Sequence, residues 1–227
     1  MIIDKALEVK KFYDINYFPM PYSAQAVKNY QGLNRYISFI SKSIQQSSSV
    51  LDAGCGTGFI TNYLAYTYSK KKFTGVDFAG SIDHAKQIKQ ELGLTNLSFV
   101  KDDLTKFNSA KKFDAVICQG VLHHIPEYKQ VLVRLKNMLS DDGIFVIGLY
   151  HPWGKTLQKI MPNNYHNKTL EIDQEQHPFE LSFWGGDVKK MFDGYKFINK
   201  HPSVLCNYRN GGLTTYVFQK ENLNGLD

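Results

Sequence analysis

The chain has 227 residues, of which 43% are hydrophobic and 21% charged, and this balance excludes a disordered, collagen-like or disulfide-dominated chain. A chain of this length buries about 70% of its unfolded surface, so one domain, or one domain with an insertion, needs no metal or disulfide to fold. The net charge of +6 is spread along the chain, with +3 in residues 1–49, +2 in 50–150 and +1 in 151–227, and only three of the 27 basic residues are Arg. Nucleic-acid binding is therefore weakly supported, because Arg is the residue suited to bidentate phosphate and base contacts.

Apolar runs and cysteines indicate the compartment. No apolar run reaches 18 residues, so we expect no membrane helix. The start, from Met1 to Lys5, contains an acidic residue and no apolar core, so we expect no signal peptide. The three cysteines are scattered without a Cys-x-x-Cys spacing, which is typical of a reducing compartment and does not suit a zinc site. We therefore expect a cytoplasmic protein without a bound metal.

The first 46 residues are expected to form a helical cap. From Ala26 onward, apolar residues recur at three- and four-residue spacing, which predicts a helix with one apolar stripe: Tyr30, Leu33, Ile37, Ile40 and Ile44. Before this helix, Pro19 and Pro21 interrupt an aromatic stretch and exclude a continuous helix there.

From residue 49 onward, short apolar strands alternate with helices. Strands are expected at 50–53, 73–76, 97–100, 113–118, 144–149, 195–199 and 213–218. Helices are expected at 59–68, at 81–92 with Ser81 as the N-cap, at 127–139 and at 187–192. The alternation predicts a mainly parallel sheet covered on both faces, and the last two strands predict an antiparallel edge. Residues 150–185 break the alternation and are expected to form a lid or insertion.

A glycine-rich turn follows the first expected strand. Residues 51–58 read LDAGCGTG, a Gly-x-Gly-x-Gly spacing with Asp52 two residues before its first glycine. Glycine allows close backbone approach, and the helix N-terminus that follows favours the negative groups of a ligand. The dinucleotide fingerprint has the different spacing Gly-x-Gly-x-x-Gly. Asp52 ends a buried strand and needs a partner, and a cationic ligand group such as an α-amino group would serve.

Acidic residues also end the next expected strands. Asp77 comes nineteen residues after Gly58, and a carboxylate there can accept hydrogen bonds from both hydroxyls of a ribose. Asp102 and Asp103 end the third strand, and the fourth continues into CQGVLHHI, residues 118–125. Because the carboxyl ends of the strands line the ligand crevice of an open α/β sheet, we expect these segments to converge.

These segments resemble the class I S-adenosylmethionine-dependent methyltransferases. The resemblance rests on five of them: LDAGCGTG (51–58), TGVD (74–77), VKDDL (100–104), FDAVICQGVLHHI (113–125) and LKNMLSDDGIFVIG (135–148). It implies an α/β fold with a seven-stranded Rossmann-like methyltransferase sheet in the order 3-2-1-4-5-7-6, strand 7 antiparallel, and helices on both faces. Residues 1–46 would then be an N-terminal helical cap, and 47–227 the methyltransferase domain, with the lid at 150–185.

The resemblance also implies the cofactor S-adenosyl-L-methionine, with S-adenosyl-L-homocysteine as the product. The glycine-rich turn would approach the methionine part of the cofactor, Asp77 its ribose, and either Asp103, which we favour, or Asp102 its adenine amino group. The implied cofactor residues are Asp52, Gly54, Cys55, Gly56, Asp77, Phe78, Asp103, Leu104, Gln119 and Gly120.

Several side chains are candidates for contact with a methyl acceptor. His123 and His124 are candidate general bases, because His titrates near neutral pH, and the alternative is that they are loop histidines that hold backbone groups. The candidate substrate or lid residues are Tyr13, Tyr17, Tyr22, His151, Trp153, His166 and His177, for which surface or helix packing is the alternative. Trp153-Gly154 and the His177–Glu180 segment also resemble a branch of small or uncharacterised methyltransferases.

We therefore expect methyl transfer to a nitrogen or oxygen atom of a small molecule. The chain has no Pro-Pro or Pro-Cys dipeptide, which disfavours the DNA amino- and cytosine-methyltransferase patterns. The alternatives are an RNA or protein acceptor, a nicotinamide-dependent oxidoreductase, and a non-catalytic scaffold that binds the cofactor.

Overall fold

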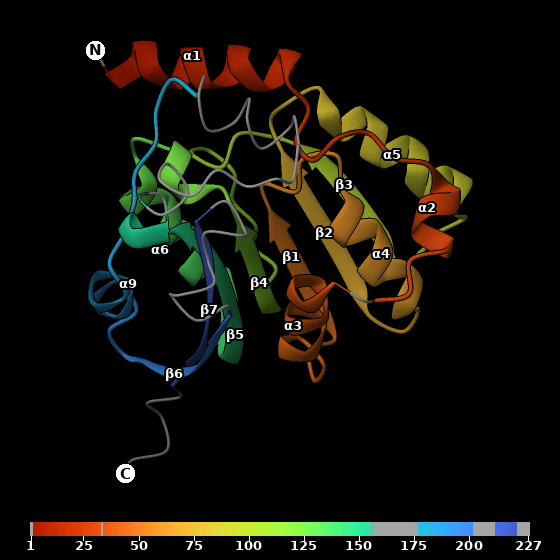
Figure 1. Ribbon diagram of the computed structural model, residues 1–227. Helices are drawn as coiled ribbons and strands as arrows, with labels where there is room; N and C mark the ends of the chain where they lie inside the picture. The colour runs from red at the N-terminus through yellow and green to blue at the C-terminus, as the bar shows by residue number, and fades with distance from the viewer. Residues whose placement is uncertain (1, 33, 155, 157–176, 202–211, 222–227) are drawn as a thin grey trace.

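The computed structural model describes residues 2–32, 34–154, 156, 177–201 and 212–221. These residues form a seven-stranded sheet in the order β3-β2-β1-β4-β5-β7-β6 (Figure 1). The strands are β1 (Ser49–Ala53), β2 (Lys72–Asp77), β3 (Leu97–Lys101), β4 (Phe113–Gln119), β5 (Leu139–Tyr150), β6 (Tyr195–His201) and β7 (Leu213–Lys220). β7 is antiparallel to β5 and β6, and the other neighbouring strands are parallel. The predicted strand order and direction are confirmed.

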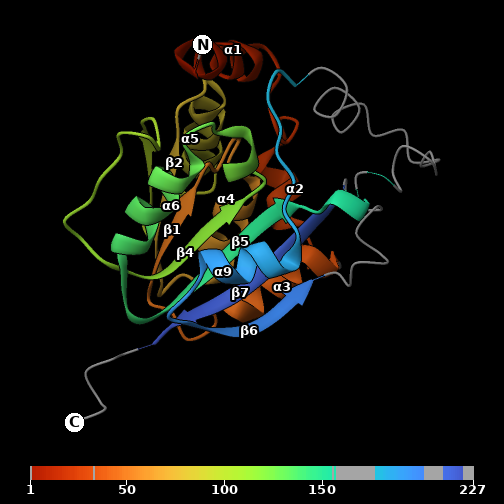
Figure 2. The same cartoon turned by 90° about the vertical axis from the view of Figure 1, so that its left-hand side faces the viewer.

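Helices cover both faces of the sheet. The helices of the described residues are α1 (Ile2–Ile15), α2 (Ala24–Lys28), α3 (Arg35–Ser43), α4 (Phe59–Thr67), α5 (Ser81–Glu91), the 3₁₀ helix η1 (Leu122–His124), α6 (Tyr128–Asn137) and α9 (Gly185–Met191). Figure 2 shows α6 and α9 on one face. Within β1, Leu51 packs with residues of α6 and α9, whereas the preceding Val50 packs with residues of α3 and α4. Successive strand residues point to opposite faces, so a strand buried on both faces is a continuous apolar run.

The helix predicted from Ala26 onward is wrong in its length, because it is divided into α2 and α3. Asn29 ends α2, and Gly32 follows with φ +67°. The Asn34 side chain then accepts a backbone hydrogen bond and caps α3. A positive-φ glycine and an Asn N-cap both favour the end of a helix over its interior. The predicted stripe is retained in part: Ile37, Ile40 and Ile44 are buried, and Leu33 lies outside the described residues.

The three N-terminal helices occupy different places. α1 lies across the end of the sheet where the parallel strands finish (Figure 1). α2 packs against α4 and α5 through Ala24 and Val27, and α3 packs on a sheet face through Ile40. Of the predicted N-terminal cap, α1 is therefore the part that covers the strand ends.

Some element boundaries differ from the prediction. The N-cap of α5 is Gly80, and Ser81 is its first helical residue, with a buried side chain. β5 begins at Leu139, five residues earlier than predicted, because Leu139 already pairs with Phe113 of β4 before a register shift. α6 consequently ends at Asn137.

Of the predicted lid at 150–185, residues 155 and 157–176 lie outside the described part, and so does His166. The described residues from 177 onward lie along η1 and the end of β5. Leu181 donates its backbone N–H to His123 O over 2.8 Å, and Phe183 donates to Tyr150 O over 2.8 Å. No helix among the described residues has the length and apolar character that crossing a membrane requires.

Candidate functional site

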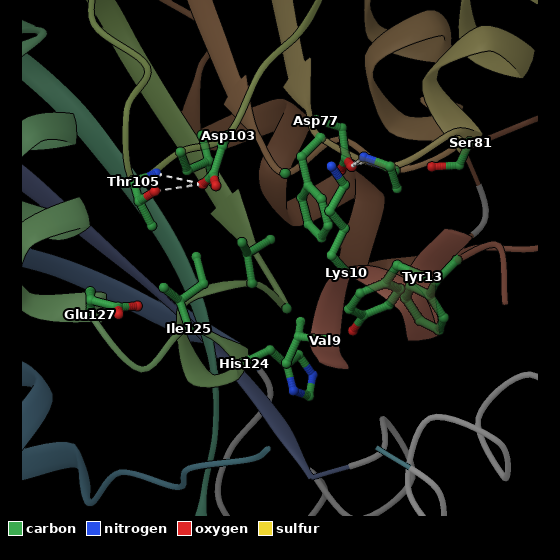
Figure 3. A pocket seen from close by; sticks show the side chains of 18 of the residues that line it. Val9, Lys10, Tyr13, Asp77, Ser81, Asp103, Thr105, His124, Ile125 and Glu127 are labelled. Atoms are coloured by element: carbon green, nitrogen blue, oxygen red, sulfur yellow. Dashed lines mark hydrogen bonds between the residues drawn. The ribbon is translucent and has the colours of Figure 1, made fainter. Parts of the chain in front are cut away.

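A cavity of about 410 Å³ lies at the carboxyl ends of the parallel strands, beneath α1. Ten of the predicted site residues line it: Tyr13, Gly54, Gly56, Asp77, Phe78, Asp103, Leu104, Gln119, Gly120 and His124. Figure 3 shows Asp77 and Asp103 on one side of this cavity and His124 on the other, with Lys10 and Tyr13 entering from α1. The predicted convergence of the strand-end segments is therefore seen.

The glycine-rich turn is tied to the end of β2. Gly54 and Cys55 donate their backbone N–H groups to Val76 O over 2.8 and 3.1 Å. Gly56 has φ +55° and donates its N–H to Asp77 Oδ2 over 2.7 Å. A Cβ on Gly56 would lie 2.0 Å from the carbonyl oxygen of Phe18, so a side chain at this position would displace the backbone of the N-terminal segment.

Asp77 ends β2 and is buried, with only 8% of the residue exposed. Its Oδ1 accepts the N–H of Ala79 over 2.9 Å, and its Oδ2 accepts the N–H of Gly56. Burial raises the pKa of this carboxyl above its ordinary value, and the backbone hydrogen bonds oppose that rise. Each oxygen has a second lone pair, so the carboxylate can accept further hydrogen bonds from hydroxyl groups in the cavity.

The two acidic residues after β3 differ in their position relative to the cavity. Asp103 and Leu104 line the cavity, and Asp103 Oδ1 accepts hydrogen bonds from the N–H and the hydroxyl of Thr105, both at 2.9 Å. Asp102 is not among the lining residues, and its Oδ1 accepts the N–H of Asp103 over 2.8 Å. This placement supports Asp103 over Asp102 as the residue that faces a ligand.

The end of β4 presents Gln119 and Gly120 to the cavity. Gln119 Oε1 accepts hydrogen bonds from the hydroxyls of Tyr36 (3.0 Å) and Thr215 (2.9 Å), so α3 and β7 hold its side chain. Gly120 has φ +72°, and among the described residues no atom beyond Gly120 and its two chain neighbours lies within 4 Å of the position that a Cβ would take. The backbone at Gly120 is therefore open to a ligand.

The two candidate bases lie in different surroundings. His124 lines the cavity, and its Nδ1 is 3.1 Å from the carbonyl oxygen of Phe179. A carbonyl only accepts hydrogen bonds, so Nδ1 donates, and the lone pair of the neutral ring is on Nε2. His123 is fully buried outside the cavity lining, and its ring stacks on Tyr150 with centroids 3.9 Å apart. Of the two histidines, only His124 is therefore placed where it could contact a ligand in the cavity.

Two of the implied cofactor residues turn away from the cavity. Asp52 is buried and accepts a hydrogen bond from the Thr61 hydroxyl over 2.5 Å, so Thr61 supplies the partner for which we had expected a ligand cation. Burial raises the pKa of Asp52 from 3.8 to about 6, against the lowering effect of Thr61. The Cys55 side chain packs with Ile82 and Ala85, so only the Cys55 backbone belongs to the turn.

Most of the predicted substrate or lid residues also lie outside the lining. Tyr22 packs on Phe59 and His84, and its hydroxyl bonds to Thr57 O and Asn62. Tyr17 is 37% exposed and Trp153 is 54% exposed. His151 is buried with its ring 5.2 Å from that of Trp184. His177 contacts the rings of Tyr13 and His124 from behind the lining.

α1 and Glu127 also line the cavity, although neither was predicted to do so. Leu7, Val9 and Lys10 line the cavity together with Tyr13, as does Phe18 in the following segment. The three- and four-residue spacing of the α1 residues predicts a helix, but it does not indicate which part of the molecule that helix packs on. Glu127 lines the cavity just before α6, and its Oε2 is buried without a hydrogen-bond partner among the described residues. Within the described residues, no group of three or more His, Cys, Asp or Glu side chains could hold a metal ion.

The fold and the site define an α/β protein with a ligand cavity at its strand ends. The methyltransferase domain family matches residues 44–195, which is more than half of the chain. The chain therefore belongs to the methyltransferase domain family.

Two curated relatives show the range of this similarity. The chain is 31% identical over 133 residues to (S)-coclaurine N-methyltransferase of Papaver somniferum, covering 57% of this chain and 35% of that protein. It is 27% identical over 151 residues to malonyl-[acyl-carrier protein] O-methyltransferase of Bacillus cereus, covering 66% of this chain and 54% of that protein. The chain thus spans about half or less of the length of these relatives.

A solved structure shares the fold. The 1,6-didemethyltoxoflavin-N1-methyltransferase of Burkholderia thailandensis, crystallised with 1,6-didemethyltoxoflavin and S-adenosylhomocysteine, superimposes with a TM-score of 0.67 at 18% identity. The match covers 98% of this chain and 91% of that chain.

Proposed function

We propose that this protein transfers the methyl group of S-adenosyl-L-methionine to a nitrogen or oxygen atom of a small molecule. The observation that carries the proposal is that Asp77, Asp103 and His124 line one cavity at the ends of parallel strands. Membership of the methyltransferase domain family supports it, as do relatives named for N- and O-methyl transfer.

The residues of the cavity fit this cofactor. Asp77 would hold the ribose hydroxyls, because each carboxylate oxygen accepts one backbone N–H and has a further lone pair. Asp103 would accept from the adenine amino group, with Phe78 and Leu104 beside the base. The methionine part would lie along the turn at Gly54 and the open backbone of Gly120.

When bound, the cofactor supplies an electrophilic methyl group on a sulfonium whose leaving group is a neutral thioether. The main task of the protein is then to place the nucleophile about 3 Å from that methyl group in a closed cavity. α1 covers part of this cavity through Val9, Lys10 and Tyr13. His124, with its lone pair on Nε2, would accept the proton that the N–H or O–H of the acceptor loses.

The proposed acceptor is small and partly apolar. The cavity of about 410 Å³, which lies within the usual range for one small-molecule ligand, would have to hold both the cofactor and the reacting part of the acceptor, so it leaves little room for a large acceptor. Its lining contains the apolar side chains Leu7, Val9, Phe18, Val121 and Ile125. An apolar lining beneath a helix suits a compact molecule better than a nucleic-acid backbone, which requires an open basic surface.

The test is to supply cofactor labelled in its methyl group and to follow the label. The purified protein is incubated separately with a small-molecule extract, with total RNA and with denatured protein. We expect label in the small-molecule extract, and its loss in Asp77→Ala. Label in RNA or protein would contradict the acceptor class, and cofactor binding without any labelled product would favour a scaffold.

The proposal includes a cytoplasmic location. The buried free thiols of Cys55 and Cys118 are consistent with a reducing compartment. Cell fractionation with an antibody against the protein tests this part separately, and recovery from an extracellular fraction would contradict it.

A further inference from the structure

Two short sequences of the type His-Pro-aromatic form the same hydrogen bond. In the first, Trp153 donates its backbone N–H to Nδ1 of His151 over 3.3 Å. In the second, Phe179 donates its backbone N–H to Nδ1 of His177 over 3.1 Å. Each bond joins residues two positions apart, as the side-chain oxygen of Asn does in an Asx turn. A backbone N–H only donates, so Nδ1 of each of these rings is an acceptor.

The second sequence lies against the candidate base. The carbonyl of Phe179 accepts a hydrogen bond from His124 Nδ1 over 3.1 Å. The backbone of Phe179 therefore links two imidazoles in opposite roles, because it donates to His177 and accepts from His124. The identity of each partner assigns the tautomers: the proton is on Nδ1 in neutral His124 and on Nε2 in neutral His177.

The ring of His177 also joins the base to α1. Its centroid lies 3.8 Å from that of His124, 5.3 Å from that of Tyr13 and 4.9 Å from that of Phe12. Two residues after Phe179, Leu181 donates its N–H to the backbone of η1 over 2.8 Å. The segment 177–181 is thus held between η1 and α1.

We propose that His177 is a positioning residue for His124. By accepting the N–H of Phe179, it holds the Phe179 carbonyl at Nδ1 of His124, and this keeps the basic lone pair of His124 on Nε2. The catalytic consequence rests on the proposed function, whereas the tautomer is a property of the folded chain. His177 also packs on α1. One ring therefore supports both the helix above the cavity and the tautomer of His124.

Two substitutions separate the hydrogen bond of His177 from its ring packing. His177→Asn keeps an acceptor for the N–H two residues on, as in an Asx turn, but loses the ring. His177→Phe keeps an aromatic ring and loses the acceptor. His151→Phe removes the equivalent hydrogen bond at the other His-Pro-aromatic sequence, where His151 contacts Trp184 rather than His124, and is the matched control.

The primary readout is the tautomer of His124, observed by long-range ¹H–¹⁵N NMR correlations and assigned with His124→Gln. We expect the Nδ1–H tautomer in the wild type, in His177→Asn and in His151→Phe, and a mixture of tautomers in His177→Phe. With a methyl acceptor, we expect turnover of His177→Phe to fall about tenfold, less than the roughly 10²–10⁴-fold effect of a whole general base. Its Kd for S-adenosylhomocysteine is expected to stay near the wild-type value.

An Nε2–H tautomer of His124 in the wild type overturns this inference, and that result requires no variant to fold. A His177→Phe protein with the wild-type tautomer and turnover also overturns it, as does a His177→Asn protein that loses both. If the wild type binds no S-adenosylhomocysteine, the proposed function fails, but the tautomer still decides the positioning role of His177.

Discussion

Gly56 donates its backbone N–H to Oδ2 of Asp77 over 2.7 Å, which ties the glycine-rich turn after β1 to the carboxylate that ends β2. Ala79 holds the other carboxylate oxygen at 2.9 Å. Two segments of the proposed cofactor site are therefore fixed to each other by the fold itself. Preorganisation of this kind reduces the ordering cost that a ligand must overcome on binding.

We expect Gly56→Ala to weaken the binding of S-adenosylhomocysteine by at least about tenfold, or about 1.4 kcal/mol. The physical reason is the 2.0 Å approach of the new Cβ to the backbone oxygen of Phe18, which forces the turn and the N-terminal segment apart and disturbs the hydrogen bond from Gly56 to Asp77. Gly93→Ala is the matched control, because Gly93 also has a positive φ (+66°) but, within the described part of the chain, only Gly93 itself and its chain neighbours lie within 4 Å of the Cβ position. Isothermal titration of both variants checks this, and an equal loss of affinity in the two would contradict the role of the turn.

The role of His124 is tested by two substitutions. We expect His124→Ala to keep cofactor affinity and to lose at least about tenfold in turnover, because it removes the proton acceptor. His124→Gln can still donate a hydrogen bond to the Phe179 carbonyl but cannot act as a base, so we expect the same loss. If His124→Gln retains wild-type turnover, His124 is a loop histidine that only holds the backbone.

Substitutions of Tyr13 and Tyr22 are expected to have different effects, although both residues were candidates for closing the site. Tyr13 lines the cavity and its ring lies 6.4 Å from that of Phe78, so Tyr13→Ala should weaken S-adenosylhomocysteine binding about fivefold, or about 1 kcal/mol. Tyr22→Phe removes hydrogen bonds to Thr57 and Asn62, so it should lower the free energy of unfolding by about 1 kcal/mol. Titration and urea denaturation separate the two effects, and weaker binding in Tyr22→Phe alone would reverse the assignment.

The buried carboxyl of Asp52 predicts a pH dependence of stability. Its pKa is about 6 in the folded protein, and about 3.9 is the ordinary value expected in the unfolded chain. Between these values the folded state retains a proton that the unfolded state has released, so stability falls as the pH rises from about 4 to about 6. The total loss is on the order of 3 kcal/mol.

Asp52→Asn keeps an acceptor for the Thr61 hydroxyl and cannot ionise. We therefore expect its stability relative to the wild type to increase as the pH is raised from 4 to 7. Urea denaturation of both proteins at several pH values measures the difference. A difference that stays constant with pH would show that Asp52 ionises normally in the folded protein.

The strand order and the convergence of the site could be predicted because their signals are local. The glycines at 54, 56 and 58 occur at a strand end, Asp77 ends the next strand, and Asp103 follows the strand after that at the same edge of the sheet. Topology then brings these residues to one cavity, since the ends of parallel strands are neighbours.

What could not be predicted depends on tertiary packing. Nothing in the spacing of Val9, Lys10 and Tyr13 indicates that α1 crosses the strand ends. Thr61 is one of many hydroxyl residues in the chain, and its bond to Asp52 arises only when α4 packs beside β1. Likewise, His123 and His124 are adjacent in sequence, and the 3₁₀ turn of η1 directs only His124 to the cavity.

The central claim is tested most directly by isothermal titration of the wild type and Asp77→Ala with S-adenosylhomocysteine and, separately, with NAD. We predict saturable binding of S-adenosylhomocysteine to the wild type, binding at least about tenfold weaker in Asp77→Ala, and no saturable heat with NAD. At a ligand concentration of about 100 Kd, the free energy of unfolding should rise by about 2.7 kcal/mol. Absence of both heat and thermal stabilisation with millimolar S-adenosylhomocysteine, or tighter binding of NAD, would contradict the assignment of this cavity to a methyl-donor cofactor.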